Sequence, residues 1–583
     1  MASGKPYQNS ILALRKMMTN ISRIKKLIAS LMLSAGIILI AFPSLSFGVA
    51  AEELDQKIKD QETSFYRELF DKIVYDQFAS LLRFDRIKDR LLFKKYEALD
   101  VNPFDEVPDS GFFVNRHARK HLSSEELREG PDRSEGPDLS GSLRVMKGKS
   151  DGMTAGFFVE DQKGARYLLK FDPKDNPEMA TSAETIAHKL FYAFGYHVAQ
   201  YYLIDFNPTL LTPDPKATYY NEDGFKKPLT QEALQELIEK IPKRKGGLVR
   251  ASASKLIEND KGYMDFEGRR KSDPDDLIPH EDRRSLRALR VFGSWLNHYD
   301  LREGNTLDAI ETEDGKPVVK HYLIDFGSAL GSAANHPKVP AAGYEHIVDW
   351  YEIGKAAPTL KIVEKPWERK WDELHHRGIA NPALGYFDNA EFQPEAWKTQ
   401  LPYEVFRRLT RADAFWAAKI LMSFSNEEIK AVVDTARFSD SDSAHILSEI
   451  LIVRRDIIAR YWFGHVTPLD RIRLFQVDDG TYQIRFEDLS LKYGFAPQEG
   501  TRYRYQLMSV GSGGSHRLSK YQDFEASPFS FKVPSLKPGS RLALLVQAKY
   551  GQKDDWSDPP LKIILAQKAE GATLEIVQID HGV

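Results

Sequence analysis

Asp300, Asn305 and Asp325 are the residues of this 583-residue chain whose types and spacing most clearly indicate chemistry. Asp300 and Asn305 lie in a polar stretch (HYDLREGN), and Asp325 follows a hydrophobic run further along the chain. Carboxylate and amide oxygens are ligands that Mg²⁺ prefers beside substrate phosphates. A carboxylate that holds no metal can accept a proton from an attacking hydroxyl. The three side chains therefore favour metal-assisted transfer to a hydroxyl, provided that the fold brings them together.

The elements that must position these side chains are a helix and a β-hairpin. Residues 286–296 place apolar side chains at helical spacing and lead directly into the polar stretch. A hairpin is predicted from Asn305 to Asp325, because an Asp-Gly turn at 314–315 separates two strand-like runs. Since a hairpin brings its two open ends together, Asn305 and Asp325 should be near neighbours. Gly327 allows another group to approach the backbone closely.

The upstream region predicts a second part of the same site. Residues 143–171 alternate strand-like runs with a glycine-containing loop (KGKSDGMTAG) and a turn. Backbone amides of this loop, which includes Gly148 and Gly152, could cover phosphates. Lys170 ends an apolar strand (YLLKF), where a cation is costly without a partner. Glu184, on the helix predicted next, is the best candidate for that partner.

Each of these residues also has a plainer structural interpretation. Lys170 could be an edge-strand lysine with its ammonium in water, and Glu184 could be a first-turn glutamate that complements the helix dipole. The glycines could form only a hairpin turn. We expect His298 to be a structural loop residue, because Asp300 already supplies a base. Arg302 could contact the substrate phosphate, but we favour a solvated loop charge, and we interpret the acidic residues of 265–282 as part of a charged surface loop.

The pattern His-x-Asp-x-x-x-x-Asn at 298–305, followed by Asp-Phe-Gly at 325–327, resembles the catalytic and metal-binding loops of the protein-kinase-like superfamily. The similarity covers roughly residues 141–465. It is nearest to the atypical branch that includes HipA-type toxin kinases, phosphatidylinositol kinases and secretory-pathway kinases. Tyr299 replaces the arginine of many regulated protein kinases, no clear Ala-Pro-Glu follows the second motif, and the glycine loop departs from Gly-x-Gly-x-x-Gly.

The resemblance implies a two-lobed fold with ATP and Mg²⁺, or Mn²⁺, between a strand-rich lobe and a helical lobe. By position in the motifs, the resemblance implies that Asp300 is the catalytic base and that Asn305 and Asp325 bind the metal ion. Lys170 and Glu184 would serve the phosphates, with Gly148 and Gly152 in the loop that covers the nucleotide.

The whole chain is expected to be α+β, with a kinase-like core between a helical segment and an all-β sandwich. We assign residues 1–50 to a signal peptide or membrane anchor, 51–140 to a helical lead and polar linker, 141–465 to the kinase-like domain, and 466–583 to the sandwich. The last region alternates short strands with turns such as DDG and KPGS. Its stretch LKPGSRLALLVQAKY resembles the last strands of fibronectin type III domains.

Composition narrows the function classes further. The net charge of −3, from 81 basic and 84 acidic residues, gives no argument for nucleic-acid binding. The absence of cysteine excludes disulfides, thiol nucleophiles and cysteine metal sites. Basic residues precede an uncharged run at 27–51, with small residues suited to signal-peptidase cleavage near its end. We therefore expect an exported protein, either periplasmic or secreted, or held by an uncleaved anchor and facing outside.

Two hypotheses of different classes remain open. The first is a phosphotransferase that moves the ATP γ-phosphate to a hydroxyl of a protein, lipid or glycan. The resemblance also leaves open transfer of AMP or glutamate, which some members of the atypical branch carry out instead. The second is a non-catalytic adhesion or scaffold protein with a vestigial kinase-like core and a binding sandwich. A metal-dependent hydrolase is disfavoured, because the sequence has no tight His/Asp ligand cluster.

Overall fold

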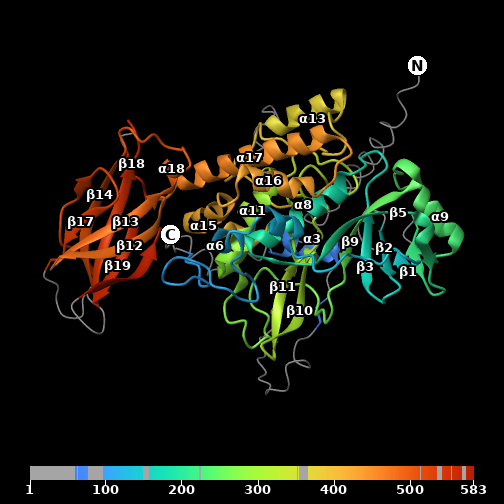
Figure 1. Cartoon of the computed structure of the whole chain (residues 1–583), viewed down its shortest axis with the longest axis horizontal. Coiled ribbons are helices and arrows are strands. Elements are labelled where there is room, and N and C mark those ends of the chain that lie inside the picture. The colour runs from blue at the N-terminus through green and yellow to red at the C-terminus, as the bar shows by residue number, and fades with distance from the viewer. Residues whose placement is uncertain are drawn as a thin grey trace, which may run out of the picture.

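The computed structural model describes residues 60–61, 64–76, 96–148, 156–221, 225–350, 352, 365–478, 480–511, 514–534, 541–552, 555–567 and 573–582. Within these ranges the chain is a mixed α+β protein, as predicted, with a sheet-rich lobe, a helical lobe and a β-rich C-terminal region (Figure 1). No helix in the described ranges is both long and apolar enough to cross a bilayer. The predicted signal peptide or anchor at 1–50 lies outside them.

The sheet-rich lobe is a six-stranded sheet in the order β5-β9-β3-β2-β1-β6. Its pairs are antiparallel except β1 with β6. The three strands predicted in 143–171 are all formed. The strands of the sheet are β1 (Leu143–Gly148), β2 (Gly156–Glu160), β3 (Arg166–Phe171), β5 (Tyr201–Phe206), β6 (Leu211–Pro213) and β9 (Val249–Lys255). A small hairpin and a helix complete the lobe: β7 (Thr218–Tyr220), β8 (Lys226–Pro228) and α9 (Gln231–Glu239).

Helix α8 (Met179–Phe194) connects this sheet to the helical lobe. Its sequence contains no glycine or proline, and the helix ends at Gly195, whose φ of 135° is readily adopted only by glycine. Nearly every side chain of α8 is buried, because the helix packs against strands on one side and helices on the other. Since α8 begins at Met179, Glu184 lies in the second turn. The interpretation of Glu184 as a first-turn dipole residue is therefore wrong.

The helical lobe follows the sheet in sequence. Its helices are α10 (Arg284–Arg287), α11 (Leu289–Leu296), α13 (Pro366–Arg377), α14 (Glu404–Arg407), α15 (Arg411–Leu421), α16 (Asn426–Asp434) and α17 (Ser441–Phe463). The predicted hairpin is formed by β10 (Thr306–Glu313) and β11 (Lys316–Leu323), and β11 also pairs with β4 (His197–Val198). Asp314 and Gly315 both have positive φ, at 49° and 75°, which a tight two-residue hairpin turn requires.

The segment before the sheet packs against the helical lobe more closely than the sequence suggested. It contains α3 (Phe65–Phe70), a short π-helix (Asp71–Tyr75), α6 (His117–Lys120) and α7 (Ser124–Glu129). The polar linker was expected to be exposed over 123–142, but Pro131 and Pro137 are buried, and Asp132 lies 2.8 Å from the ammonium of Lys189 on α8. Composition alone indicated a linker, because a sequence does not distinguish polar side chains that pair with a distant helix from polar side chains that face solvent.

Region 265–282 also contains charged residues that were expected to face solvent but are buried in ion pairs. Asp276 is buried, with its carboxylate 2.9 Å from both His280 Nε2 and Arg283 Nη2. Arg270 is buried in an ion pair with Asp308 at 2.5 Å. The interpretation of this stretch as a charged surface loop is wrong for Arg270 and Asp276, which are buried in ion pairs, whereas Arg269, Lys271 and Asp275 are exposed as predicted.

The C-terminal region contains two sheets that share one hydrophobic core. The first has the order β12-β13-β17, and the second β15-β14-β18-β19-β20 with β16 beside β14. The elements are β12 (Leu469–Asp478), β13 (Thr481–Asp488), α18 (Leu489–Lys492), β14 (Arg502–Gly511), β15 (Gly514–Arg517), β16 (Gln522–Phe524), β17 (Phe529–Lys532), β18 (Arg541–Lys549), β19 (Leu561–Gln567) and β20 (Leu574–Asp580). This is the predicted all-β tail. Its resemblance to fibronectin type III domains stays a prediction.

The last residues of the chain return to the helical lobe. His581 lies with its Nδ1 2.7 Å from Asp105 Oδ2, and its ring packs on Phe415 of α15 at 4.6 Å between centroids. Asp105 in turn pairs with Arg284 at 2.7 Å. The backbone amide of Ile579 donates to the carbonyl of Pro103. The C-terminal strands are thus bonded to the segment that precedes the first sheet.

Candidate active site

Lys170 and Glu184 form the predicted ion pair inside the sheet-rich lobe. Lys170 lies near the end of β3, between Gly156 on β2 and Ser252 on β9. Its Nζ lies 2.5 Å from Glu184 Oε1, and the hydroxyl of Ser252 donates to the other oxygen of Glu184. The side chains of Lys170 and Glu184 are only 10% and 2% exposed. Lys170 is therefore not an edge-strand lysine that extends into water.

Lys170 also contacts the Asp-Phe-Gly segment. Its Nζ lies 2.9 Å from Asp325 Oδ1, so one ammonium bridges two carboxylates from different lobes. Burial by itself would lower the pKa of Lys170, but Asp325 and Glu184 outweigh burial and raise that pKa. The lysine stays charged and points at a carboxylate that is about one-third exposed. A cation in this position is suited to bind phosphate oxygens.

Asp325 is held in a constrained backbone conformation. Its φ is +59°, a left-handed geometry that aspartate tolerates better than most residues, at a cost on the order of 1 kcal/mol. The amide of Asp325 donates to the Tyr201 hydroxyl at 3.0 Å. The next residue, Phe326, is fully buried and packs on Phe191 and His298 at 5.3 and 5.6 Å between ring centroids. Buried neighbours therefore fix the direction of the carboxylate.

His298 takes part in this packing and does not act from the surface. It is buried, and burial lowers its pKa to about 3, so it is neutral at physiological pH. Its ring contacts Phe326 and Phe191, the residues that support Asp325. His298 thus links the polar loop to the Asp-Phe-Gly segment by packing.

Asp300 and Asn305 are joined across the polar loop. The Asn305 amide nitrogen donates to the Asp300 carbonyl at 2.9 Å and to its carboxylate at 3.0 Å. The backbone of Ile324 donates to the carbonyl of Asn305, which places the loop beside the residue before Asp325. The hairpin thus brings its two ends together as predicted. Because the amide nitrogen faces Asp300, the amide oxygen lies on the opposite side of the group.

The electrostatic surroundings of Asp300 suit a general base. Burial raises its pKa, Arg302 opposes the rise, and the charge of Asp325 adds to it, so that the pKa reaches about 6. A carboxyl with this pKa is ionised at pH 7 and is a stronger base than an ordinary aspartate. The side chain is one-fifth exposed, which leaves it accessible.

Arg302 and Glu68 are site residues that sequence reasoning missed. Arg302 Nε lies 3.2 Å from Asp300 Oδ1, and its Nη1 donates to Glu68 Oε2 at 2.7 Å. Glu68 comes from α3, is buried, and also accepts from the amide of Gly304 and the hydroxyl of Tyr403. The interpretation of Arg302 as a solvated charge is wrong. Nothing in the local sequence distinguishes Glu68 from the other charges of the helical lead.

The glycine loop is described only at its edges. Gly148 is the last residue of β1, and a Cβ added there would lie 2.7 Å from the Cβ of Tyr219. Glycine at this position is therefore required by packing against β7. Gly152 lies in 149–155, outside the described residues, so the role of this loop in covering a nucleotide stays a prediction.

The donor set fits a hard divalent cation. Asp325 offers a partly exposed carboxylate, and Asn305 offers the amide oxygen that Asp300 leaves unused. Mg²⁺ and Mn²⁺ prefer such oxygen ligands and commonly keep phosphate oxygens and waters in their remaining positions. The neighbouring ammonium of Lys170 fits the phosphates themselves.

No protein-family model matches the chain, and no curated protein matches its sequence. Among solved structures, it is similar to the crystal structure of a Helicobacter pylori proinflammatory kinase, CtkA, at 13% identity and a TM-score of 0.30, over 56% of this chain and 97% of that one. A crystal structure of the Golgi casein kinase is similar at 8% identity and a TM-score of 0.27, over 74% of this chain and 92% of that one. A second crystal structure of the Golgi casein kinase, with Mn/ADP bound, is similar at 10% identity and a TM-score of 0.23, over 68% of this chain and 95% of that one. At these TM-scores the likeness assigns no role to any residue here.

Proposed function

We propose that this chain is an exported, ATP-dependent phosphotransferase that moves the γ-phosphate to a hydroxyl of a protein, lipid or glycan. The observation that carries the proposal is the bridge from Glu184 through Lys170 to Asp325, at 2.5 and 2.9 Å. It joins a phosphate-binding cation to a candidate metal ligand. Asp300 and Asn305 lie at the open end of the β10–β11 hairpin, next to Asp325. In this proposal Asp300 supplies the base and Asn305 the second metal ligand.

The roles follow from the chemistry of each side chain. Asp300 accepts the proton of the acceptor hydroxyl while the oxygen of that hydroxyl attacks the γ-phosphorus of ATP. The bond between the γ-phosphorus and the bridging oxygen breaks, and ADP leaves with that oxygen. Lys170, oriented by Glu184, binds phosphate oxygens. Asn305 and Asp325 would hold Mg²⁺ or Mn²⁺, which offsets phosphate charge when bound. Gly148 and Gly152 would lie in the loop over the nucleotide.

Two features favour catalysis over a vestigial core that serves only as a scaffold. A buried Lys–Glu pair costs desolvation free energy, so it is poor evidence for a purely stabilising role. The pKa of Asp300, raised to about 6 by burial and by Asp325, is a property that a base needs and a scaffold does not. The mass of the modified product identifies the transferred group, since AMP and phosphate differ in mass.

Nucleotide binding tests the proposal directly, and Lys170 is the residue to change. We expect Mg·ATP to raise the melting temperature of the full chain, and ATP with EDTA to raise it much less. Lys170→Met should weaken Mg·ATP binding by about 10- to 100-fold, because it removes a charge-assisted bond to phosphate worth roughly 1.5–3 kcal/mol. The measurements are thermal shift across an ATP titration and transfer from γ-labelled ATP to candidate acceptors.

Lys532→Met is the matched control, because Lys532 is exposed on β17 of the C-terminal region, in a different sheet from Lys170. It should bind nucleotide like the unchanged chain. Absence of any nucleotide-dependent shift at every Mg²⁺ and Mn²⁺ concentration would contradict the phosphotransferase proposal and favour the scaffold.

Glu68 gives a second prediction, as a positioning residue for the base. In Glu68→Gln, Arg302 loses its second carboxylate and pairs with Asp300 alone, which lowers the pKa of Asp300. We expect the acid limb of the pH–rate profile to move to lower pH by up to about one unit, with a several-fold lower maximal rate.

The profile is measured on both Glu68→Gln and Glu125→Gln, an exposed glutamate on α7. A purely structural role for Glu68 would lower the rate of Glu68→Gln equally at all pH values, and that result would remove Glu68 from the account of the base. Glu125→Gln should reproduce the unchanged profile.

A further inference from the structure

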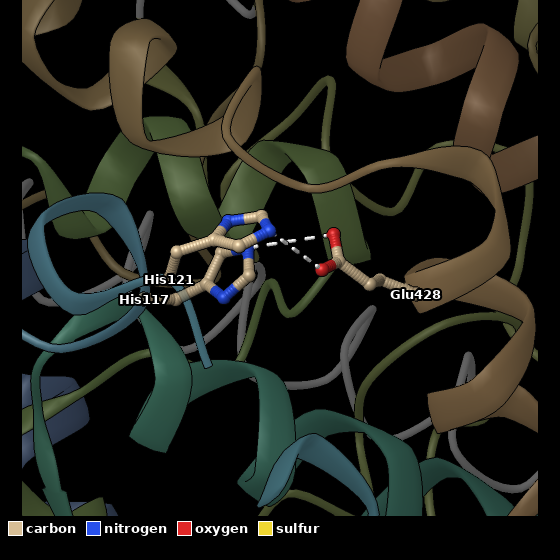
Figure 2. Close-up of side chains that lie close together, drawn as sticks. All are labelled: His117, His121 and Glu428. Carbon is tan, nitrogen blue, oxygen red and sulfur yellow. Dashed lines mark ion pairs between the residues drawn. The ribbon is translucent and has the colours of Figure 1, made fainter. Parts of the chain in front are cut away.

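Two histidines and a glutamate converge away from the candidate active site. His117 begins α6 (His117–Lys120), and His121 caps the C-terminal end of this helix with a left-handed backbone, at a φ of 49°. Their ring centroids are 5.1 Å apart. Glu428 lies in the first turn of α16 and points at both rings (Figure 2). Its carboxylate oxygens lie 3.6 Å from His117 Nε2 and 3.5 Å from His121 Nε2.

These separations match a tetrahedral metal site. Zinc lies about 2.0–2.2 Å from imidazole nitrogen and carboxylate oxygen, so two ligands at a tetrahedral angle are about 3.4 Å apart. The two nitrogen–oxygen distances, which involve different oxygens of Glu428, exceed this value by 0.1–0.2 Å, and one ligand atom from each residue can be chosen so that all lie within 4.8 Å of one another. His117 Nε2 also lies 3.1 Å from the carbonyl oxygen of Ser423, so ligation through this nitrogen requires that hydrogen bond to break and the three ligand atoms to move closer together.

The ligands are held in place by their surroundings. The ring of His117 packs on Phe424 at 4.2 Å between centroids, and the residue is fully buried. The Ser425 amide donates to Glu428 Oε2 at 2.7 Å as part of the capping box of α16, which leaves Oε1 toward His121. Such outer contacts orient metal ligands in known sites. His121 is 72% exposed, so an ion and a water ligand can enter from solvent.

We propose that His117, His121 and Glu428 bind a divalent transition-metal ion, with Zn²⁺ the best match. Two imidazoles and one carboxylate favour Zn²⁺ over Mg²⁺, which prefers an all-oxygen set. The bound ion joins the segment that precedes the first sheet to helix α16 of the helical lobe. This site is independent of Asn305 and Asp325, and it does not rest on the proposed phosphotransferase activity.

The test uses the full chain, treated with EDTA and dialysed, and ZnCl₂ alone as the probe. We expect one tightly bound Zn²⁺ per chain by elemental analysis. The melting temperature should rise by about 2–5 °C at roughly 100 times the dissociation constant, while MgCl₂ at equal concentration gives no rise. CoCl₂ in place of zinc should give the visible absorption of a tetrahedral ion.

Two variants separate a metal site from simple ion pairs. His121→Ala alters an exposed residue, and Glu428→Gln keeps an amide oxygen able to serve the capping box while removing the carboxylate charge. Each should weaken Zn²⁺ binding at least tenfold, whereas His445→Ala, an exposed histidine on α17, should not. Zn²⁺ binding that both variants leave unchanged, or no binding at all, would overturn the proposal and leave only ion pairs.

Discussion

Asp325→Asn is expected to lower Mg²⁺-dependent phosphate transfer by about a thousandfold or more, with the chain still folded. The change removes the charge of a proposed metal ligand. It also replaces one of the two carboxylates that pair with Lys170 by an uncharged amide. Loss of one preorganised electrostatic group at a reacting centre costs about 10²–10³ in rate, and loss of the metal adds to this. Asparagine is preferred to alanine because it tolerates the left-handed backbone at this position, where φ is +59°.

The chain supplies a closely matched control for this variant. Asp314 is also an aspartate with positive φ, at 49°, but it lies exposed at the tip of the β10–β11 hairpin. Asp314→Asn therefore makes the same chemical change in the same backbone geometry, and it should retain full transfer. Both variants are compared by thermal stability, by Mg·ATP thermal shift and by γ-phosphate transfer. Asp325→Asn with normal transfer would exclude this carboxylate from the chemistry.

Asp300→Asn is expected to reduce transfer by about 10²–10⁴-fold while Mg·ATP still binds. Asparagine keeps the size of the side chain and can still accept the hydrogen bond from Asn305, but it cannot take a proton from the acceptor. The Mg·ATP thermal shift should therefore stay close to that of the unchanged chain, unlike the shift of Lys170→Met. Equal loss of nucleotide binding and transfer in Asp300→Asn would assign Asp300 to binding instead.

The same residue predicts a pH dependence. Because burial and Asp325 raise the pKa of Asp300 to about 6, the transfer rate should fall as pH decreases through 6 and reach its plateau above pH 7. The folded pKa lies above the ordinary value of 3.8, so the stability contribution of this group is present at low pH and is lost as pH rises through 6. Protonation of Asp300 thus does not unfold the chain. Melting temperatures at pH 5.5 and 7 check that a lower rate is not unfolding, and a flat rate from pH 5 to 8 would contradict the assignment.

The parts of the site that could be predicted depend on short-range rules. An Asp-Gly turn between two strand-like runs is enough to place Asn305 near Asp325, because a two-residue turn fixes the register of the two strands and so sets which residues meet at the open end. A lysine at the end of an apolar strand needs a partner, and the next helix offers Glu184. Both inferences use residues close in sequence, and the structure forms the hairpin, with Ile324 bonded to Asn305, and the Lys170–Glu184 ion pair.

The remaining contacts depend on packing between distant segments. Glu68 lies 234 residues before Arg302, and no periodicity relates the two positions. Asp132 and Asp276 looked like solvated charges because composition does not reveal which charges pair after folding. His117 and His121 are four residues apart, but the third member of their cluster comes from α16, some 300 residues later in the sequence.

The contacts of His581 have a consequence for how the C-terminal sandwich moves. A domain joined only by a short linker swings freely, and any ligand it holds samples many orientations. Here the chain end contacts Asp105 and Phe415, and Asp105 is tied to Arg284 in the helical lobe. The sandwich is therefore attached at the end of α17, at its last residues, and through Asp470 of β12, which lies 3.3 Å from Lys419 of α15. Attachments at separate points restrict rotation about the end of α17, so a partner bound to the sandwich would be presented to the rest of the molecule over a narrow range of angles.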